Sequence, residues 1–283
     1  MKNIKVICDS LADIPEKLIE KYDIDVVPLT VILDGKEYKD GVDLSSQEFY
    51  KKLRESNVHP KTSQATYTQF KEIFEKYINQ GRDIIYIAGS SVATGTYQSA
   101  IMAKNNIEKG KIYIYDSKSF SFAIGIMVIE ASKLIEEGKY ISEIIKVLDN
   151  IKEKAYVLFS VDTLEYLQKG GRISSTKAAI GGILNIKPIL DINDGLVSPI
   201  CQVRGKKNVI SKVVELIKHN CGENLSNQVI YIGYSDDIKE KEQLAKFVKD
   251  ELNPKDIMFF EIGTCIGAHA GPGVTGLICF KEI

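Results

Sequence analysis

The chain has 283 residues, of which 44% are hydrophobic and 27% are charged, and this composition is typical of a globular protein and excludes a disordered one. Lys and Arg total 37 against 38 for Asp and Glu, so the net charge of −1 provides no overall attraction to nucleic acid or acidic membranes. The five cysteines form no Cys-x-x-Cys pair, so neither a metal site of the zinc type nor a disulfide framework is indicated.

The first half of the chain alternates short apolar runs with amphipathic segments, which is the pattern of strands and helices in an α/β fold. A strand begins almost at the first residue, without a secretory signal segment, so we expect a cytoplasmic protein. The predicted strands are residues 5–8, 26–33, 84–88 and 112–115, and the predicted helices are residues 15–22, 46–55, 67–79, 96–107 and 120–137. The apolar run at 122–129 is much shorter than the roughly 20 residues of a membrane span.

Two of these helices have recognisable starts. Asp13 precedes Pro15 as a capping carboxylate ahead of a helix-compatible proline, and Ser45-Ser46-Gln47-Glu48 resembles a capping box.

A second unit is predicted to begin at residue 155, because residues 156–160 read as a new strand after a helix at 142–152. The expected domains are therefore residues 1–154 and 155–283. In the second unit, Asn193-Asp194-Gly195 joins strands 186–192 and 196–202 as a hairpin, because Asp-Gly tolerates positive φ angles. Strand 229–233, helix 239–252 and strands 257–262 and 277–280 follow.

Four polar clusters lie at strand ends, where open α/β sheets usually bind ligands. They are Asp9-Ser10, Lys61-Thr62-Ser63-Gln64, the segment from Gly89 to Thr96, and Asp116-Ser117. Their hydroxyl and backbone N–H groups would suit an anion if they converged, whereas each cluster alone is more typical of a helix cap.

Two catalytic motifs fail on inspection. Ser91 lacks the second glycine of the Gly-x-Ser-x-Gly nucleophile elbow. Residues 271–276 match Gly-x-Gly-x-x-Gly but lead into a strand instead of a helix, which argues against a dinucleotide site. The same segment leaves His269 on a glycine-rich loop, where backbone would approach a ligand closely.

Two small basic clusters complete the candidates. Gly170-Gly171 joins a short helix to another helix and leaves Arg172 projecting from a turn, and Arg204 with Lys206 and Lys207 follows the hairpin. These side chains are either solvated surface charge or contacts for phosphate or an acidic partner.

Taken in order, six segments resemble the DegV family of lipid-binding proteins over essentially the whole chain. They are Cys8-Asp9-Ser10, Thr62-Ser63-Gln64, Ser90 through Ala100, Leu164 through Ile173, Asn185 through Leu190, and Ile266 through Gly276. The resemblance implies two α/β domains, with a largely parallel sheet in the N-terminal domain and a mixed sheet in the C-terminal domain, and an acyl chain buried between or within them.

The same resemblance implies that hydroxyl groups hold the carboxylate of one long-chain fatty acid. The contacts carry over first onto Thr62 and Thr94, with Ser63, Ser91 and His269 as further candidates. The family's usual Ser-Gly-Thr is Thr94-Gly95-Thr96 in this chain, and Ala93 replaces an apolar branched residue.

Family members are similar to the binding subunit of a bacterial fatty acid kinase, whose separate ATP-binding subunit phosphorylates the bound fatty acid to an acyl phosphate. On this reading the chain is a carrier that has no catalytic residue and no cofactor, and transient membrane contact is compatible with it. Arg172 and Arg204 are then candidates for docking the kinase or holding the product phosphate. Residues such as Ile124, Ile126 and Met127 are candidates for shaping the path of the acyl chain.

Two competing functions remain at this point. An acyl- or phosphoryl-transfer enzyme would use Ser91 or Thr94 as nucleophile and His269 as base, although no orienting partner for the histidine and no phosphate loop is evident. A DNA-binding regulator is disfavoured by the balanced charge and by the lack of a helix-turn-helix pattern.

Overall fold

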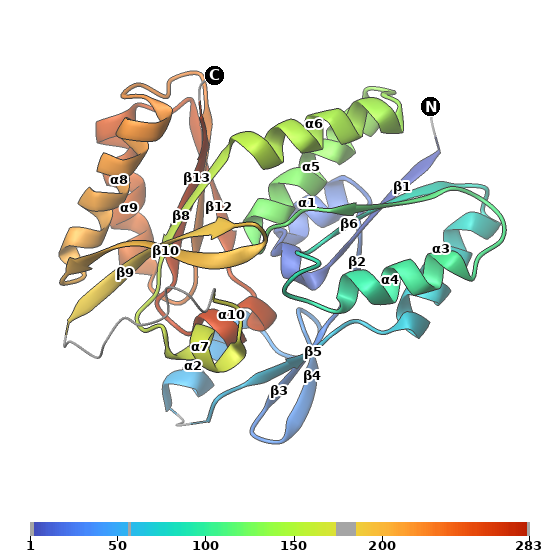
Figure 1. Cartoon of the computed structure of the whole chain (residues 1–283), viewed down its shortest axis with the longest axis horizontal. Coiled ribbons are helices and arrows are strands. Elements are labelled where there is room, and N and C mark those ends of the chain that lie inside the picture. Colours follow the sequence, from blue (N-terminus) through green and yellow to red (C-terminus); the bar gives the residue numbers. More distant parts are fainter. Residues whose placement is uncertain (1–2, 56–57, 174–184, 282–283) are drawn as a thin grey trace.

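The structure is a computed structural model that describes residues 3–55, 58–173 and 185–281, and three β-sheets organise it (Figure 1). The first sheet is parallel and has the strand order β2-β1-β6-β7. Its strands are β1 (Ile4–Asp9), β2 (Asp25–Val27), β6 (Asp83–Ala88) and β7 (Ile112–Asp116). Strand β1 is buried at every position, which explains why the central strands read as continuous apolar runs.

Helices cover both faces of this sheet. Helices α3 and α4 pack against each other, α3 onto β6 and α4 onto β7. Helix α5 packs onto β1 and β6 and also against α6 (Figure 1). The helices of this half are α1 (Glu16–Lys21), α2 (Ser46–Glu55), α3 (Tyr67–Asn79), α4 (Thr96–Asn105), α5 (Phe122–Glu136) and α6 (Ile141–Lys154), with a 3-10 turn η1 (Ser10–Ala12) after β1.

The second sheet is a small antiparallel one that the sequence analysis did not anticipate. Its order is β4-β3-β5, from β3 (Thr30–Leu33), β4 (Lys36–Lys39) and β5 (Lys61–Ser63). The single strand predicted at 26–33 is wrong, because the chain leaves the parallel sheet after Val27, and Pro28, which has no N–H for a ladder, separates β2 from β3. Asp34 and Gly35 turn the hairpin with φ angles of 51° and 74°.

The third sheet is mixed and has six strands in the order β10-β9-β8-β13-β11-β12. Only β11 and β12 pair in parallel. The predicted hairpin is present, with Asp194 and Gly195 at φ angles of 49° and 80°. The strands are β8 (Ala155–Ser160), β9 (Ile186–Asn193), β10 (Leu196–Arg204), β11 (Val229–Tyr234), β12 (Asp256–Glu261) and β13 (Thr275–Phe280). The expected α/β fold, with a parallel first sheet and a mixed later one, is thus confirmed.

One face of the mixed sheet carries α8 (Lys207–Cys221), which was not predicted, and α9 (Ile238–Leu252) (Figure 1). The short helices α7 (Glu165–Gly170) and α10 (Thr264–Ala270) pack against each other at the end of this half of the chain. Within the described ranges, no helix is long and apolar enough to cross a membrane.

Helix α5 lies between the two large sheets, and this explains the apolar run at 122–129. One side of the helix, including Ile124 and Met127, joins the core of the parallel sheet, and the other, including Phe122 and Ile126, packs on Phe260 of the mixed sheet. A helix that is buried on both sides is apolar all round. Ile124, Ile126 and Met127 are therefore core residues.

Two local expectations need comment. Asp13 does not cap α1, because the residue before this helix is Pro15 and no side-chain cap bond is made. The second helix expected after Gly170-Gly171 falls at residues 174–184, outside the described residues. The domain boundary at 154/155 stays a prediction, although α6 ends at Lys154 and β8 begins at Ala155.

Candidate functional site: a cavity with one polar end

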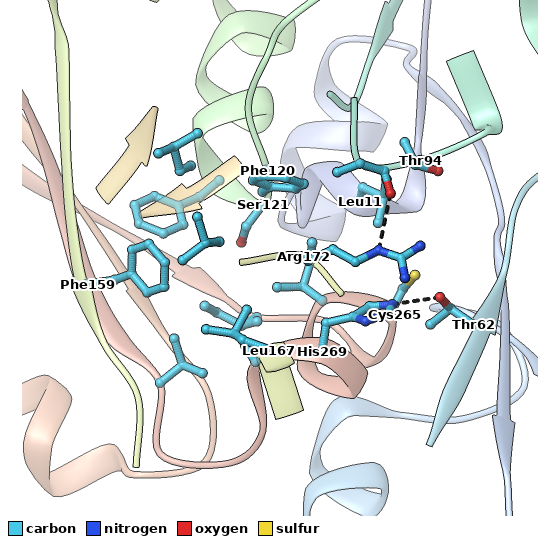
Figure 2. A pocket seen from close by; sticks show the side chains of 18 of the residues that line it. Leu11, Thr62, Thr94, Phe120, Ser121, Phe159, Leu167, Arg172, Cys265 and His269 are labelled. Atoms are coloured by element: carbon cyan, nitrogen blue, oxygen red, sulfur yellow. Dashed lines mark hydrogen bonds between the residues drawn. The ribbon is translucent and has the colours of Figure 1, made fainter. Parts of the chain in front are cut away.

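A cavity lies where the loops of the parallel sheet, the small sheet and the mixed sheet meet, and about 830 Å³ of atom-free space, part of it open to solvent, lies within it. Figure 2 shows side chains from both halves of the chain around this space. The apolar part of the lining is Leu11, Leu29, Ala93, Phe120, Phe122, Val157, Phe159, Leu167, Ile192, Val197, Ile262, Ile266, Ala270 and Val274.

The polar end of the cavity is centred on Thr62 and His269. Thr62 Oγ1 lies 2.7 Å from His269 Nε2, and both side chains line the cavity (Figure 2). Successive residues of a strand face opposite ways, so Thr62 of β5 faces the cavity while Ser63 is exposed and does not line it. If Nε2 carries the proton and donates it to Thr62, the threonine hydroxyl hydrogen is available to a bound anion.

The structure places His269 on helix α10, which corrects the expectation of a glycine-rich loop. The helix ends before Gly271, whose φ of 78° stops it. At its start, Oδ1 of the buried Asp40 accepts hydrogen bonds from Thr264 N at 3.2 Å, Thr264 Oγ1 at 2.6 Å and Cys265 N at 3.3 Å. Asp40 thus holds the helix that presents the histidine.

The imidazole of His269 is held in its neutral form. Burial, and secondarily the positive charge of Arg172, lower the pKa of His269 to about 4. Its Nδ1 is buried and makes no hydrogen bond to any residue that the structure describes. The backbone of Gly170 packs so closely here that a Cβ at this position would come within 2.4 Å of Nδ1.

Arg172 also lines the cavity. Its Nε donates to Ala93 O at 3.2 Å (Figure 2), and another guanidinium nitrogen donates to Gly170 O. The side chain therefore lies half-buried in the cavity wall beside His269, where its charge favours an anion, and does not project from a surface turn.

Thr94 contributes a second hydroxyl to the cavity wall. Its Oγ1 accepts from Thr96 N at 3.2 Å and lies 2.9 Å from Thr96 Oγ1, at the start of α4. Thr94 is therefore a local structural residue that also lines the cavity.

Ser91 lies away from the cavity. Lys118 Nζ donates to Ser91 Oγ at 2.9 Å, and Ser91 N donates to Asp116 Oδ1 at 3.2 Å. The lining of the cavity does not include Ser91, so the structure does not bring this hydroxyl together with His269. The transfer-enzyme alternative is left with Thr94 only.

The remaining polar clusters have structural roles. Asp9 accepts from Leu11 N at 3.0 Å and bonds the Tyr86 hydroxyl, and Ser10 Oγ accepts from Leu29 N at 3.0 Å. Two of the four clusters therefore reach the cavity, and those at Asp9 and Asp116 do not.

The second basic cluster is on the surface, away from the cavity lining. Arg204 is exposed at the end of β10, as is Lys207 at the start of α8. Lys206 is paired, with its Nζ 2.9 Å from both Asp237 Oδ2 and Glu240 Oε2. Among the described residues, no group of His, Cys, Asp and Glu side chains is arranged to hold a metal ion.

The family model described as "Uncharacterised protein, DegV family" matches residues 3–282. The chain belongs to the DegV family. A DegV domain-containing protein of Caldanaerobacter subterraneus subsp. tengcongensis is 38% identical over 282 residues and covers all of both chains.

Solved DegV structures share the fold. A DegV protein from Thermus thermophilus, described by its fatty acid binding, aligns with a TM-score of 0.90 and 28% identity over 99% of this chain and 100% of its own. DegV from Bacillus subtilis, described as a fatty acid binding protein, aligns with a TM-score of 0.88 and 29% identity over the whole of both chains.

Most of the apolar lining was missed from sequence. Val157, Phe159, Ile192 and Val197 are strand residues of the mixed sheet, and their alternation predicts a buried face without saying which ligand or segment covers it. Ser121 was also missed, because the polar cluster predicted at the end of β7, Asp116-Ser117, lies a few residues before it in the sequence.

Proposed function

We propose that this chain binds one long-chain fatty acid in the cavity, with its carboxylate at Thr62, Thr94, Arg172 and His269. The observation that carries the proposal is the Thr62–His269 pair at one end of a cavity whose lining is mostly apolar. Two DegV proteins of the same fold are described as binding fatty acids, and this supports the proposal.

The physical chemistry of a fatty acid suits this arrangement. Each methylene removed from water contributes about 0.8 kcal/mol, so a long tail in an apolar cavity supplies most of the affinity. The carboxylate needs hydrogen-bond donors once it leaves water, and the threonine hydroxyls and the Arg172 guanidinium provide them.

The proposal includes a division of labour. The chain acts as a carrier in the cytoplasm, and a separate ATP-binding kinase subunit phosphorylates the bound fatty acid to an acyl phosphate. The exposed side chain of Arg204 is then a docking contact for that subunit. Arg172, which lies in the cavity wall, is placed to contact the head group or its phosphate.

The docking contact has a direct test. Arg204→Glu is expected to weaken kinase-dependent turnover while leaving fatty acid binding unchanged, because the side chain is outside the cavity lining. Turnover that is unaffected by this charge reversal would remove Arg204 from the docking surface.

The binding function is tested by extracting the purified protein under denaturing conditions and identifying bound lipid by mass spectrometry. Wild type is expected to carry about one fatty acid per chain, and the double variant Thr62→Ala/Thr94→Ala much less. Ser63→Ala is the matched control, because Ser63 neighbours Thr62 but does not line the cavity. Wild type without lipid, before and after incubation with fatty acid, would favour a transfer enzyme using Thr94 and His269.

A further inference from the structure

A further polar residue, Ser121, lies in the wall of the cavity apart from the head-group residues, and it pairs with Asp13 behind the wall. Ser121 lines the cavity between two aromatic residues of the same segment, Phe120 and Phe122, and is only 6% exposed. Its Oγ shares a hydrogen bond with Asp13 Oδ2. In Figure 2 the Ser121 hydroxyl is well separated from the Thr62–His269 pair.

The backbone holds this pair in an unusual conformation. Ser121 has φ 53° and ψ −141°, values that residues other than glycine rarely adopt, and Asp13 has φ 48° in the left-handed region that Asp tolerates. Such conformations persist where the surroundings over-determine them, and they cluster at ligand sites. Asp13 Oδ1 also accepts from Gly263 N at 3.0 Å. Asp13 therefore connects three segments that are distant in sequence, its own, that of Ser121 and that of Gly263.

The positions of the protons decide what the pair offers to a ligand. Ser121 Oγ donates its hydrogen to Asp13 Oδ2, while Asp13 Oδ1 accepts from Gly263 N. The hydroxyl oxygen of Ser121 keeps a lone pair that can accept a hydrogen bond from a hydroxyl group of a ligand in the cavity that Ser121 lines.

We propose that Ser121 is a second subsite, which binds an oxygen substituent on the acyl chain, so that long-chain hydroxy fatty acids are ligands of this cavity. The inference rests on the proposed fatty acid binding and adds a ligand class to it. A ligand hydroxyl that faces the apolar walls loses its hydrogen bonds to water without replacement. Only a hydroxyl at the chain position that meets Ser121 recovers one.

The test uses the delipidated full chain, a fluorescent fatty acid as the displaced probe, and stearic acid with a series of monohydroxystearic acids as competitors. One positional isomer is expected to bind about tenfold more tightly than the other isomers, the effect of one recovered hydrogen bond to a buried hydroxyl. Isomers that all bind equally, or all more weakly than stearic acid with no preferred position, would overturn the subsite.

Two variants separate the subsite from a structural role of the pair. Ser121→Gly removes the hydroxyl and tolerates the positive φ, so it should abolish the preference among isomers while stearic acid still binds. Asp13→Asn should keep the preference, because Ser121 keeps its hydroxyl group and Asn tolerates a positive φ. A preference that survives Ser121→Gly refutes the subsite alone, whereas failure of stearic acid to bind wild type refutes the proposed function itself.

Discussion

Among single residues, His269 depends on neighbours that leave it little freedom. Thr62 occupies one ring nitrogen, and the missing side chain of Gly170 makes room for the other. Arg172 adds a positive charge that opposes protonation of the ring. The same charge attracts a carboxylate, so Arg172 favours both an anion in the cavity and the neutral form of His269.

This arrangement predicts a dependence of stability on pH. In the unfolded chain His269 takes up a proton near pH 6.5, whereas in the folded protein it does so only near 4. Between these values the unfolded state binds more protons, so the free energy of unfolding falls as the pH is lowered from 6.5 to 4. The titration of His269 lowers the free energy of unfolding by at most roughly 3 kcal/mol, because each unit of pKa difference between the two states corresponds to about 1.36 kcal/mol.

The measurement compares delipidated wild type with His269→Gln by denaturant unfolding at several pH values between 4 and 7. The variant is expected to lose less stability on acidification, because Gln does not titrate. Asp9 changes stability in the opposite direction, since burial raises its pKa to about 6, but it is common to both proteins and cancels in the difference. Parallel pH profiles would show that His269 is not held neutral.

At the scale of elements, helix α10 positions the site, and it is held in place by Asp40, a residue that is distant in sequence but in direct contact with it. Asp40, which is 4% exposed, bonds Thr264 and Cys265 at the start of α10. We expect Asp40→Ala to lower the free energy of unfolding by about 1–3 kcal/mol, because buried donors lose their acceptor. Fatty acid affinity should fall as well, since His269 lies on this helix.

A matched control is Asp237→Ala. Asp237 caps α9 by accepting from Glu240 N at 2.9 Å, and it does not line the cavity. This variant should lose about 1–2 kcal/mol of unfolding free energy and keep its fatty acid affinity. Chemical denaturation and fluorescent displacement measure the two quantities, and equal loss of affinity in both variants would contradict a specific role for α10.

The same scale shows what the sequence can predict. Local signals sufficed for β1, β6 and the β9–β10 hairpin, whose apolar runs and Asp-Gly turn are self-contained. The small sheet was missed because β5 has only three residues, Lys61–Ser63, and its pairing with β3 is long-range. Family resemblance directed attention to Thr62, Thr94 and His269, but the anchoring of α10 by Asp40 joins residues 224 positions apart and leaves no local pattern.

In the whole molecule, the two halves of the chain share both a core and the cavity. Helix α5 packs on the parallel sheet through Met127 and on the mixed sheet through Phe122. The cavity is lined by Leu11 and Thr62 from one half and by Phe159 and His269 from the other. A bound fatty acid would therefore stabilise the contact between residues 1–154 and 155–283, and not one of them alone.

This sharing predicts how the protein unfolds. Calorimetry of the delipidated chain is expected to give one cooperative transition, because separating the halves exposes the apolar faces of α5. Saturating fatty acid should raise the temperature of the whole transition. At a free ligand concentration of 100 times Kd, binding adds about 2.7 kcal/mol to the free energy of unfolding. Two transitions, of which the ligand shifts only one, would place the binding energy within a single half and would contradict a cavity shared between them.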